Sequence, residues 1–116
     1  MRKLLIKIAA LCLPMVTLAE TPQSSKEILL DNDSVLVVRA IYAPGAESGM
    51  HTHDYHHRVL YTVKGGQLQL IANDKTTPTQ VINLSDGQTV YLPATTHNVV
   101  NIGESEVVIV ETELKK

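Results

Sequence analysis

Five histidines are the residues of this 116-residue chain whose type and spacing could do chemistry: His51, His53, His56, His57 and His97. His51 and His53 are separated by one residue, so on a β-strand both imidazoles lie on one face, a few ångströms apart. Neutral imidazoles held in this way can share a divalent metal ion. His97 follows much later in the chain and completes the group only if the sheet folds back over the first pair.

The elements that must position these histidines are predicted to be β-strands. The chain has no Phe and no Trp, so its core must be built mainly from Val, Ile, Leu and Tyr, which favour strands. Short apolar runs are separated by turn residues, and no helical period is visible. The expected strands cover residues 27–30, 35–42, 58–63, 67–72, 79–84, 89–92, 98–102 and 107–113. Eight short strands favour a single all-β sandwich or barrel.

Residues 35–38 and 107–110 are apolar on both faces of their expected strands. A strand of this kind is covered on both sides, as in a two-sheet roll or at a dimer interface. The pattern therefore adds a homodimer to the expected partners, and a strand covered by a loop is the alternative.

The first nineteen residues are typical of a cleavable signal peptide. Three basic residues come first (Arg2, Lys3 and Lys7), and residues 8–18 are mostly apolar. Thr17 and Ala19 place small residues at the two positions that a signal peptidase recognises. We expect cleavage after Ala19 and a periplasmic or secreted location, with a retained amphipathic anchor as the alternative. The apolar run is too short for a membrane span.

The predicted organisation is a signal peptide (1–19), a loose polar leader (20–26) and one β-barrel domain (27–116). Cleavage removes three of 10 basic residues and none of the 12 acidic ones, so the mature charge is 7 − 12 = −5. This balance argues against nucleic acids and anionic membranes, which need a clustered basic face. The only cysteine, Cys12, falls inside the signal peptide, so the mature domain has no disulfide.

Two motifs between residues 44 and 113 resemble those of the cupin superfamily. The first combines a glycine, His-x-His and a later glycine, and its matching residues are Gly45, His51, His53 and Gly65. The second combines a glycine, a proline, a histidine and an asparagine, and its matching residues are Gly87, Pro93, His97 and Asn101. The resemblance implies a double-stranded β-helix, or jelly-roll, barrel.

The first motif departs from the family at its acidic position. Counting three residues after His53 reaches His57, whereas counting four reaches Arg58, which alone keeps the six-residue gap to Gly65. His57 can bind a metal, His56 is a possible substitute, and Arg58 cannot bind a cation. The expected ligands are His51, His53 and His97, with His57 favoured as the fourth. In the second motif, Thr95 stands where the family usually has glycine.

An all-imidazole site suits a divalent transition metal (Fe, Zn, Cu, Ni or Mn) rather than Mg or Ca, which prefer oxygen ligands. Three or four protein ligands leave open positions for a small molecule. The resemblance implies dioxygenase, isomerase or lyase chemistry on a small-molecule substrate. A non-catalytic cupin that binds a small ligand or a metal, and a metal-free structural dimer, are the alternatives.

Other polar side chains near the motifs are weaker candidates for the pocket. Tyr55, Tyr61 and Tyr91 can donate hydrogen bonds to a ligand, although a tyrosine in a barrel wall is more often a core residue. Glu47 and Asp54 flank the first motif and can act as a base or hold a ligand histidine; a solvated loop carboxylate is the more common case.

Overall fold

The computed structural model describes residues 3–16, 18 and 20–116. This part of the chain forms nine β-strands and no helix, so the expected all-β fold is confirmed. The strands are β1 (Ser24–Asp31), β2 (Val35–Tyr42), β3 (His51–His53), β4 (His57–Lys64), β5 (Gly66–Ala72), β6 (Gln80–Leu84), β7 (Thr89–Leu92), β8 (Thr95–Asn101) and β9 (Val107–Leu114).

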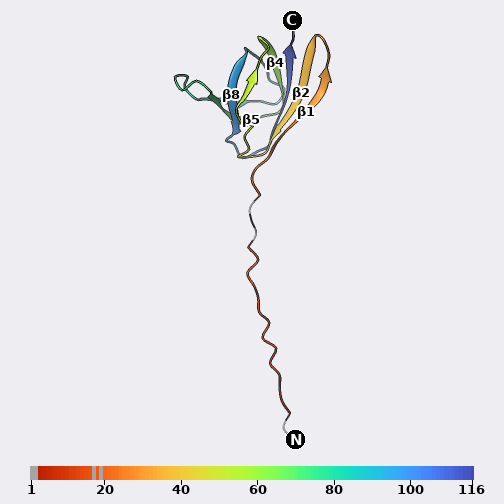
Figure 1. Cartoon of the computed structure of the whole chain (residues 1–116), viewed down its shortest axis with the longest axis vertical. Helices are drawn as coiled ribbons and strands as arrows, with labels where there is room; N and C mark the ends of the chain where they lie inside the picture. The colour runs from red at the N-terminus through yellow and green to blue at the C-terminus, as the bar shows by residue number, and fades with distance from the viewer. Residues whose placement is uncertain (1–2, 17, 19) are drawn as a thin grey trace.

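Two antiparallel sheets make up the barrel (Figure 1). One has the order β1-β2-β9-β4-β7 and the other the order β3-β8-β5-β6. The chain crosses repeatedly from one sheet to the other, so strands that are distant in sequence become neighbours, such as β2 with β9. This crossing pattern is that of a double-stranded β-helix, as expected.

The core lies between the two sheets and is built from the aliphatic residues that the composition predicts. Leu60, Leu68, Val99, Val107 and Ile109 are all buried there. Both sheets contribute to this core, and the histidine-bearing strands β3 and β8 therefore face β9 and β4 across the barrel interior.

The observed strands differ from the expected ones at three places. β1 begins at Ser24, inside the expected leader 20–26, because residues 24–26 pair with the end of β2. These residues are polar and lie on an edge strand, so they show no apolar alternation in the sequence. β3 is an additional strand of three residues, and β8 begins at Thr95 because it pairs with β3.

Residues 3–16 have no regular secondary structure and extend away from the barrel (Figure 1). Three residues that the signal-peptide prediction uses, Arg2, Thr17 and Ala19, lie outside the described residues. No helix in the described part of the chain has the length and apolar character needed to cross a membrane.

Two motif glycines have clear structural reasons. A Cβ at Gly65 would lie 2.1 Å from the carbonyl oxygen of Leu84, closer than real Cβ atoms come. Gly87 has φ +79°, a left-handed conformation that other residues adopt only with strain. The first glycine permits a close approach between chain segments, and the second permits a turn.

Asn101, the last residue of the second motif, holds the end of the barrel together. Its buried Nδ2 donates to the carbonyl oxygens of Tyr42 (3.0 Å) and Ser105 (2.8 Å). Its Oδ1 accepts from the backbone N–H of Gly103 at 3.0 Å. One buried amide thereby satisfies polar groups of β2 and of the β8–β9 turn, which would otherwise lack partners.

Candidate metal centre

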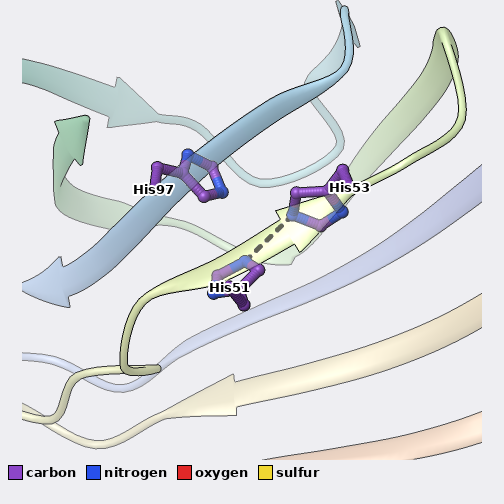
Figure 2. Close-up of side chains that lie close together, drawn as sticks. All are labelled: His51, His53 and His97. Atoms are coloured by element: carbon purple, nitrogen blue, oxygen red, sulfur yellow. Dashed lines mark hydrogen bonds between the residues drawn. The ribbon is translucent and has the colours of Figure 1, made fainter. Parts of the chain in front are cut away.

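His51, His53 and His97 converge in the barrel interior because β3 pairs with β8. His51 lies directly opposite His97 in this ladder, and His53 follows on the same face of β3. The ring centroids are 4.7 Å apart for His51 and His53, 4.8 Å for His51 and His97, and 5.2 Å for His53 and His97. Figure 2 shows the three imidazoles grouped between the two strands. One nitrogen of each ring lies within 4.8 Å of the others.

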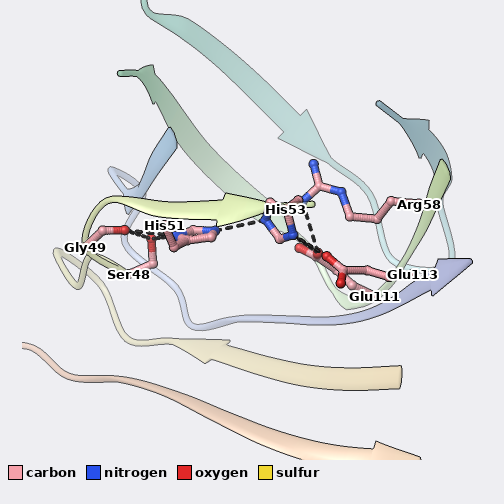
Figure 3. Close-up of polar contacts among 7 residues, drawn as sticks. All are labelled: Ser48, Gly49, His51, His53, Arg58, Glu111 and Glu113. Carbon is pink, nitrogen blue, oxygen red and sulfur yellow. Dashed lines mark hydrogen bonds and ion pairs between the residues drawn. The ribbon is translucent and has the colours of Figure 1, made fainter. Parts of the chain in front are cut away.

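The surroundings of His51 and His53 determine which ring nitrogens carry the protons. Nδ1 of His51 lies 2.9 Å from the carbonyl oxygen of Gly49, which can only accept, so this nitrogen donates. Nδ1 of His53 donates to the carboxylate of Glu113 (Figure 3). In both neutral rings the lone pair therefore resides on Nε2. The two Nε2 atoms are 2.9 Å apart, so in these neutral rings the two lone pairs face each other, an arrangement that a cation bound to both nitrogens would stabilise.

His97 supplies a third nitrogen without a partner. The residue is 7 % exposed, and its buried Nε2 makes no hydrogen bond within the described part of the chain. A buried polar nitrogen without a partner costs free energy. An ion bound to Nε2 of all three histidines would satisfy His97 and separate the facing lone pairs, so these residues fit a divalent transition metal.

Burial also keeps the three histidines in the neutral form that a metal needs. Desolvation lowers the pKa of His53 to about 4 and the pKa of His97 to about 3. It also lowers the pKa of His51 below its ordinary value, although less strongly. Repulsion from the neighbouring rings adds to the effect for His97. All three imidazoles therefore have free lone pairs near pH 7.

The expected fourth ligand, His57, lies outside this cluster, which corrects that expectation. Its side chain is exposed and contacts the hydroxyl of Tyr91. His56 is exposed in the turn between β3 and β4. Arg58, the residue that keeps the motif's six-residue gap to Gly65, is the one whose side chain faces the barrel interior. Successive residues of a strand face opposite sides, so an inward Arg58 requires an outward His57.

Arg58 belongs to a buried charged network beside the histidines (Figure 3). It is 1 % exposed, and its Nη1 donates to Oε2 of Glu111 at 3.1 Å. The same Glu111 oxygen lies 3.9 Å from Nδ1 of His53, and Glu113 holds that nitrogen directly. β9 therefore supplies two carboxylates close to β3.

Sequence analysis missed these two carboxylates. Glu111 and Glu113 share a face of β9 with the core residues Val107 and Ile109. Alternation along 107–113 places both acids on one face of the strand, but residues 107–110 are apolar on both faces, so the sequence does not show that this face is the inward one.

The other candidate side chains do not join the site. Tyr61 and Tyr91 are 48 % and 60 % exposed on the outer face of the barrel, and Tyr55 lies in the β3–β4 turn. Glu47 is exposed and accepts a hydrogen bond from Asn98, and Asp54 is also exposed.

The inward-facing tyrosine is Tyr42, which sequence analysis did not single out. Burial raises its pKa to about 12. It therefore remains a neutral phenol at physiological pH.

Two cavities adjoin the histidines. One, of about 180 Å³, is lined by His97, Arg58 and Glu111 together with many aliphatic side chains. The other, of about 190 Å³, is lined by His51 and His53 with Glu111, Glu113 and Lys26 among its walls. Space for a small molecule therefore lies on both sides of the cluster.

Comparison with known proteins agrees with this architecture. Residues 38–113 match a family model described as a cupin domain. The chain is 36 % identical over 96 residues to the beta-alanine degradation protein BauB of Pseudomonas aeruginosa, an alignment covering 81 % of this chain and 96 % of that protein.

Solved structures show the same fold. A cupin domain from Bordetella pertussis Tohama I has a TM-score of 0.74 and 28 % identity, with 84 % of this chain and 99 % of that one covered. A double-stranded β-helix protein from Klebsiella pneumoniae has a TM-score of 0.63 and 18 % identity, with 80 % and 77 % covered.

Proposed function

Because the chain belongs to the cupin family, we propose that it binds one divalent transition metal through His51, His53 and His97 and acts on a small molecule at that ion. The observation that carries this proposal is the convergence of three neutral imidazoles, two of them buried and that of His51 half-buried, with the Nε2 lone pairs of His51 and His53 facing each other at 2.9 Å. Such an arrangement is costly without an ion and favourable with one.

The protein's own contribution is to orient the rings and to limit access of water. Gly49 and Glu113 hold the Nδ1 atoms of His51 and His53, which fixes the direction of both rings. Arg58, paired with Glu111, occupies the place of the family's acidic ligand. His51, His53 and His97 would hold the ion, which would supply Lewis-acid chemistry and, if it were iron, copper, nickel or manganese, oxygen-activating chemistry.

This chemistry agrees with a dioxygenase, isomerase or lyase of small-molecule metabolism. The name of the Pseudomonas relative, a beta-alanine degradation protein, supports a role in the breakdown of small metabolites. A non-catalytic cupin that only binds a ligand or the metal is the alternative, and the absence of turnover with a redox-active ion in place would favour it.

Elemental analysis tests the metal proposal. The mature, untagged protein is purified without chelator, beside the variants His97→Ala and His56→Ala. We expect about one transition-metal ion per chain in the parent and in the exposed-histidine control, and little in His97→Ala. Absence of metal from the parent after reconstitution would overturn the proposal. The ion found selects the next assay: oxygen uptake for iron or copper, isomerase and hydrolytic screens for zinc.

We further propose that residues 1–19 are removed during export to the periplasm or the medium. Residues 3–16 contribute no strand, and apolar side chains such as Leu4 are 88 % exposed. The first strand begins at Ser24, so cleavage after Ala19 leaves the barrel intact. Intact-mass measurement of the exported protein should give a chain that begins at Glu20, and a full-length chain would refute the cleavage.

The outer face of the five-stranded sheet supports a proposed homodimer. Tyr61 and Val63 on β4 and Tyr91 on β7 are exposed there, and the outward residues of β2 and β9 are also mostly apolar. An antiparallel sheet that faces water usually carries polar side chains on that face. A second copy of this chain offers a matching apolar face, and packing the two faces together removes both from water.

A further inference from the structure

Arg58 has far more hydrogen-bonding capacity than its surroundings use. The side chain is 1 % exposed, and among the described residues Glu111 is its only hydrogen-bond and ion-pair partner. Its buried Nε has no partner. A guanidinium carries five N–H donors in a fixed planar fork, so several of them have no partner among the described residues. Figure 3 shows one terminal nitrogen turned toward the carboxylates and the other away from them.

Arg58 is one of the residues that line the 180 Å³ cavity. The charged or titratable residues in its lining are Arg58, Glu111 and His97, and Thr77, Gln80 and Thr95 add further polar groups. The rest is largely aliphatic, and its lining includes Leu60, Leu68, Leu70, Ile82, Leu92, Val99 and Ile109. The lining therefore matches a molecule with one polar head and a short apolar body. A cavity of 150 Å³ accommodates benzene, so this one takes about six to eight non-hydrogen atoms.

Formal charges determine the sign of that polar head. Near the histidines, Arg58 contributes +1, and Glu111 and Glu113 contribute −1 each. The three histidines are neutral when they bind a metal. The total formal charge of these side chains is −1 without an ion and becomes +1 when a divalent ion is bound. A ligand that neutralises the loaded site is therefore a monoanion, and a guanidinium fork pairs best with a carboxylate or a similar planar oxyanion.

We propose that the cavity beside His97 is the substrate chamber, that it takes a small aliphatic monocarboxylate, and that Arg58 binds the carboxylate while the aliphatic walls hold the body. This inference rests on the proposed function, because the charge balance requires the metal. It assigns to Arg58 a role in recognition at the motif position where the family usually has an acidic residue.

The second cavity is a poorer site for such a ligand. Both Glu111 and Glu113 line it, and the cation among its lining residues, Lys26, lies on the exposed strand β1. Glu111 also lines the first cavity, but there Arg58 lies beside it and compensates its charge.

Calorimetric titration of zinc-loaded protein with pentanoate and pentanamide tests the inference. The two molecules have nearly the same size and shape, but only pentanoate is charged. We expect pentanoate to bind at least about tenfold more tightly, since hydrogen bonds to charged groups are the stronger ones. The metal-free protein should lose this preference, because its interior group carries the opposite formal charge.

Three variants locate the binding residues. Arg58→Gln combined with Glu111→Gln removes the buried pair without changing the net charge, and pentanoate binding should weaken about tenfold. Arg39→Gln is the matched control, because Arg39 pairs with Glu27 on the outer face of the sheet; it should bind normally. Ala72→Leu fills part of the cavity wall and should weaken pentanoate more than acetate, which tests the chamber even if the double variant does not fold.

The outcomes separate this inference from the proposed function. Zinc uptake at one ion per chain with equal affinity for pentanoate and pentanamide overturns the chamber inference and leaves the metal proposal intact. A folded, zinc-loaded double variant that binds pentanoate as tightly as the parent would also overturn the chamber inference and leave the metal proposal intact. Failure to take up any metal overturns both.

Discussion

His51 and His53 direct their Nε2 atoms at each other across 2.9 Å, while their Nδ1 atoms bind two different acceptors, the carbonyl oxygen of Gly49 and the carboxylate of Glu113. The protein therefore holds both lone pairs in place before any ion arrives. Because these rings need little reorganisation on binding, a metal ion should stabilise the fold measurably.

Replacing His53 with alanine should abolish metal binding, because it removes one of three converging nitrogens. The parent should be stabilised by about 2.7 kcal/mol when free metal is 100 times the dissociation constant, and the variant should not. Metal analysis and thermal melts with and without EDTA provide the measurement. His56→Ala, in the exposed turn, should behave as the parent. Full metal content in the His53 variant would contradict the assignment.

Glu113 should act through His53 by fixing its ring. Glu113→Ala should weaken metal affinity about 10- to 100-fold, as is typical when a carboxylate behind a metal-binding histidine is lost. Glu113→Gln should lose less, because its amide oxygen can still accept the Nδ1 proton. Competition titration with a metal indicator measures both, and exposed Glu106→Ala is the control. Equal loss in the alanine and glutamine variants would show that charge, rather than ring orientation, is the contribution.

Gly65→Ala should be strongly destabilising, because its Cβ would lie 2.1 Å from a backbone oxygen that cannot easily move. We expect a cost of about 3 kcal/mol or more, at the upper end for overpacking. Gly87→Ala is the comparison, since it has backbone strain but only the Tyr61 hydroxyl near its Cβ, at 4.0 Å, and should cost about 1–2 kcal/mol. Urea unfolding measures both; a smaller loss for Gly65→Ala would show that the chain relaxes there.

Asn101→Ala should lower stability without changing the metal site. The substitution removes three hydrogen bonds of a buried amide, so we expect a loss of about 3 kcal/mol. Metal bound per folded chain should stay at the parental value. Asn83→Ala, on an exposed position of β6, should change stability by less than about 0.5 kcal/mol. Loss of metal from folded Asn101→Ala would mean that this residue also positions His97.

Tyr61→Lys combined with Tyr91→Lys should dissociate the proposed homodimer, because it places two charges on each apolar outer face. Light scattering after size-exclusion chromatography should give a dimer mass for the parent and a monomer mass for the variant. Val81→Lys, on the other sheet and also exposed, is the control and should remain dimeric. A monomeric parent would refute the dimer.

The part of the site that the sequence predicted depends on local geometry. His51 and His53 share a face because successive side chains of any strand alternate, whatever the rest of the fold does. The strands themselves follow from apolar runs and turn residues, and all eight expected strands agree with the observed ones to within three residues at each end. The largest differences, three residues, are at the starts of β1 and β8; the polar edge residues of β1 carry no apolar signal.

Three features depended on tertiary structure instead. His97 reaches His51 only through the register of β3 against β8, which is a pairing between distant segments. The choice of Arg58 over His57 depends on how many residues the turn after β3 uses, since one residue reverses the parity of β4. Sequence analysis left that count open and favoured His57.

The sequence also left open which face of β9 is directed inward. Residues 107–110 are all aliphatic, so hydrophobicity alone does not say which alternate pair faces the core. The packing of β9 between β2 and β4 determines which face of β9 is inward. Glu111 and Glu113 lie on that face and are therefore directed toward the histidines. The sequence by itself therefore determined eight of the nine strands in the described residues, the glycines of the two motifs and the histidine pair, because these obey local rules. The third histidine, the buried arginine and both carboxylates depended on which distant strands pair and in which register.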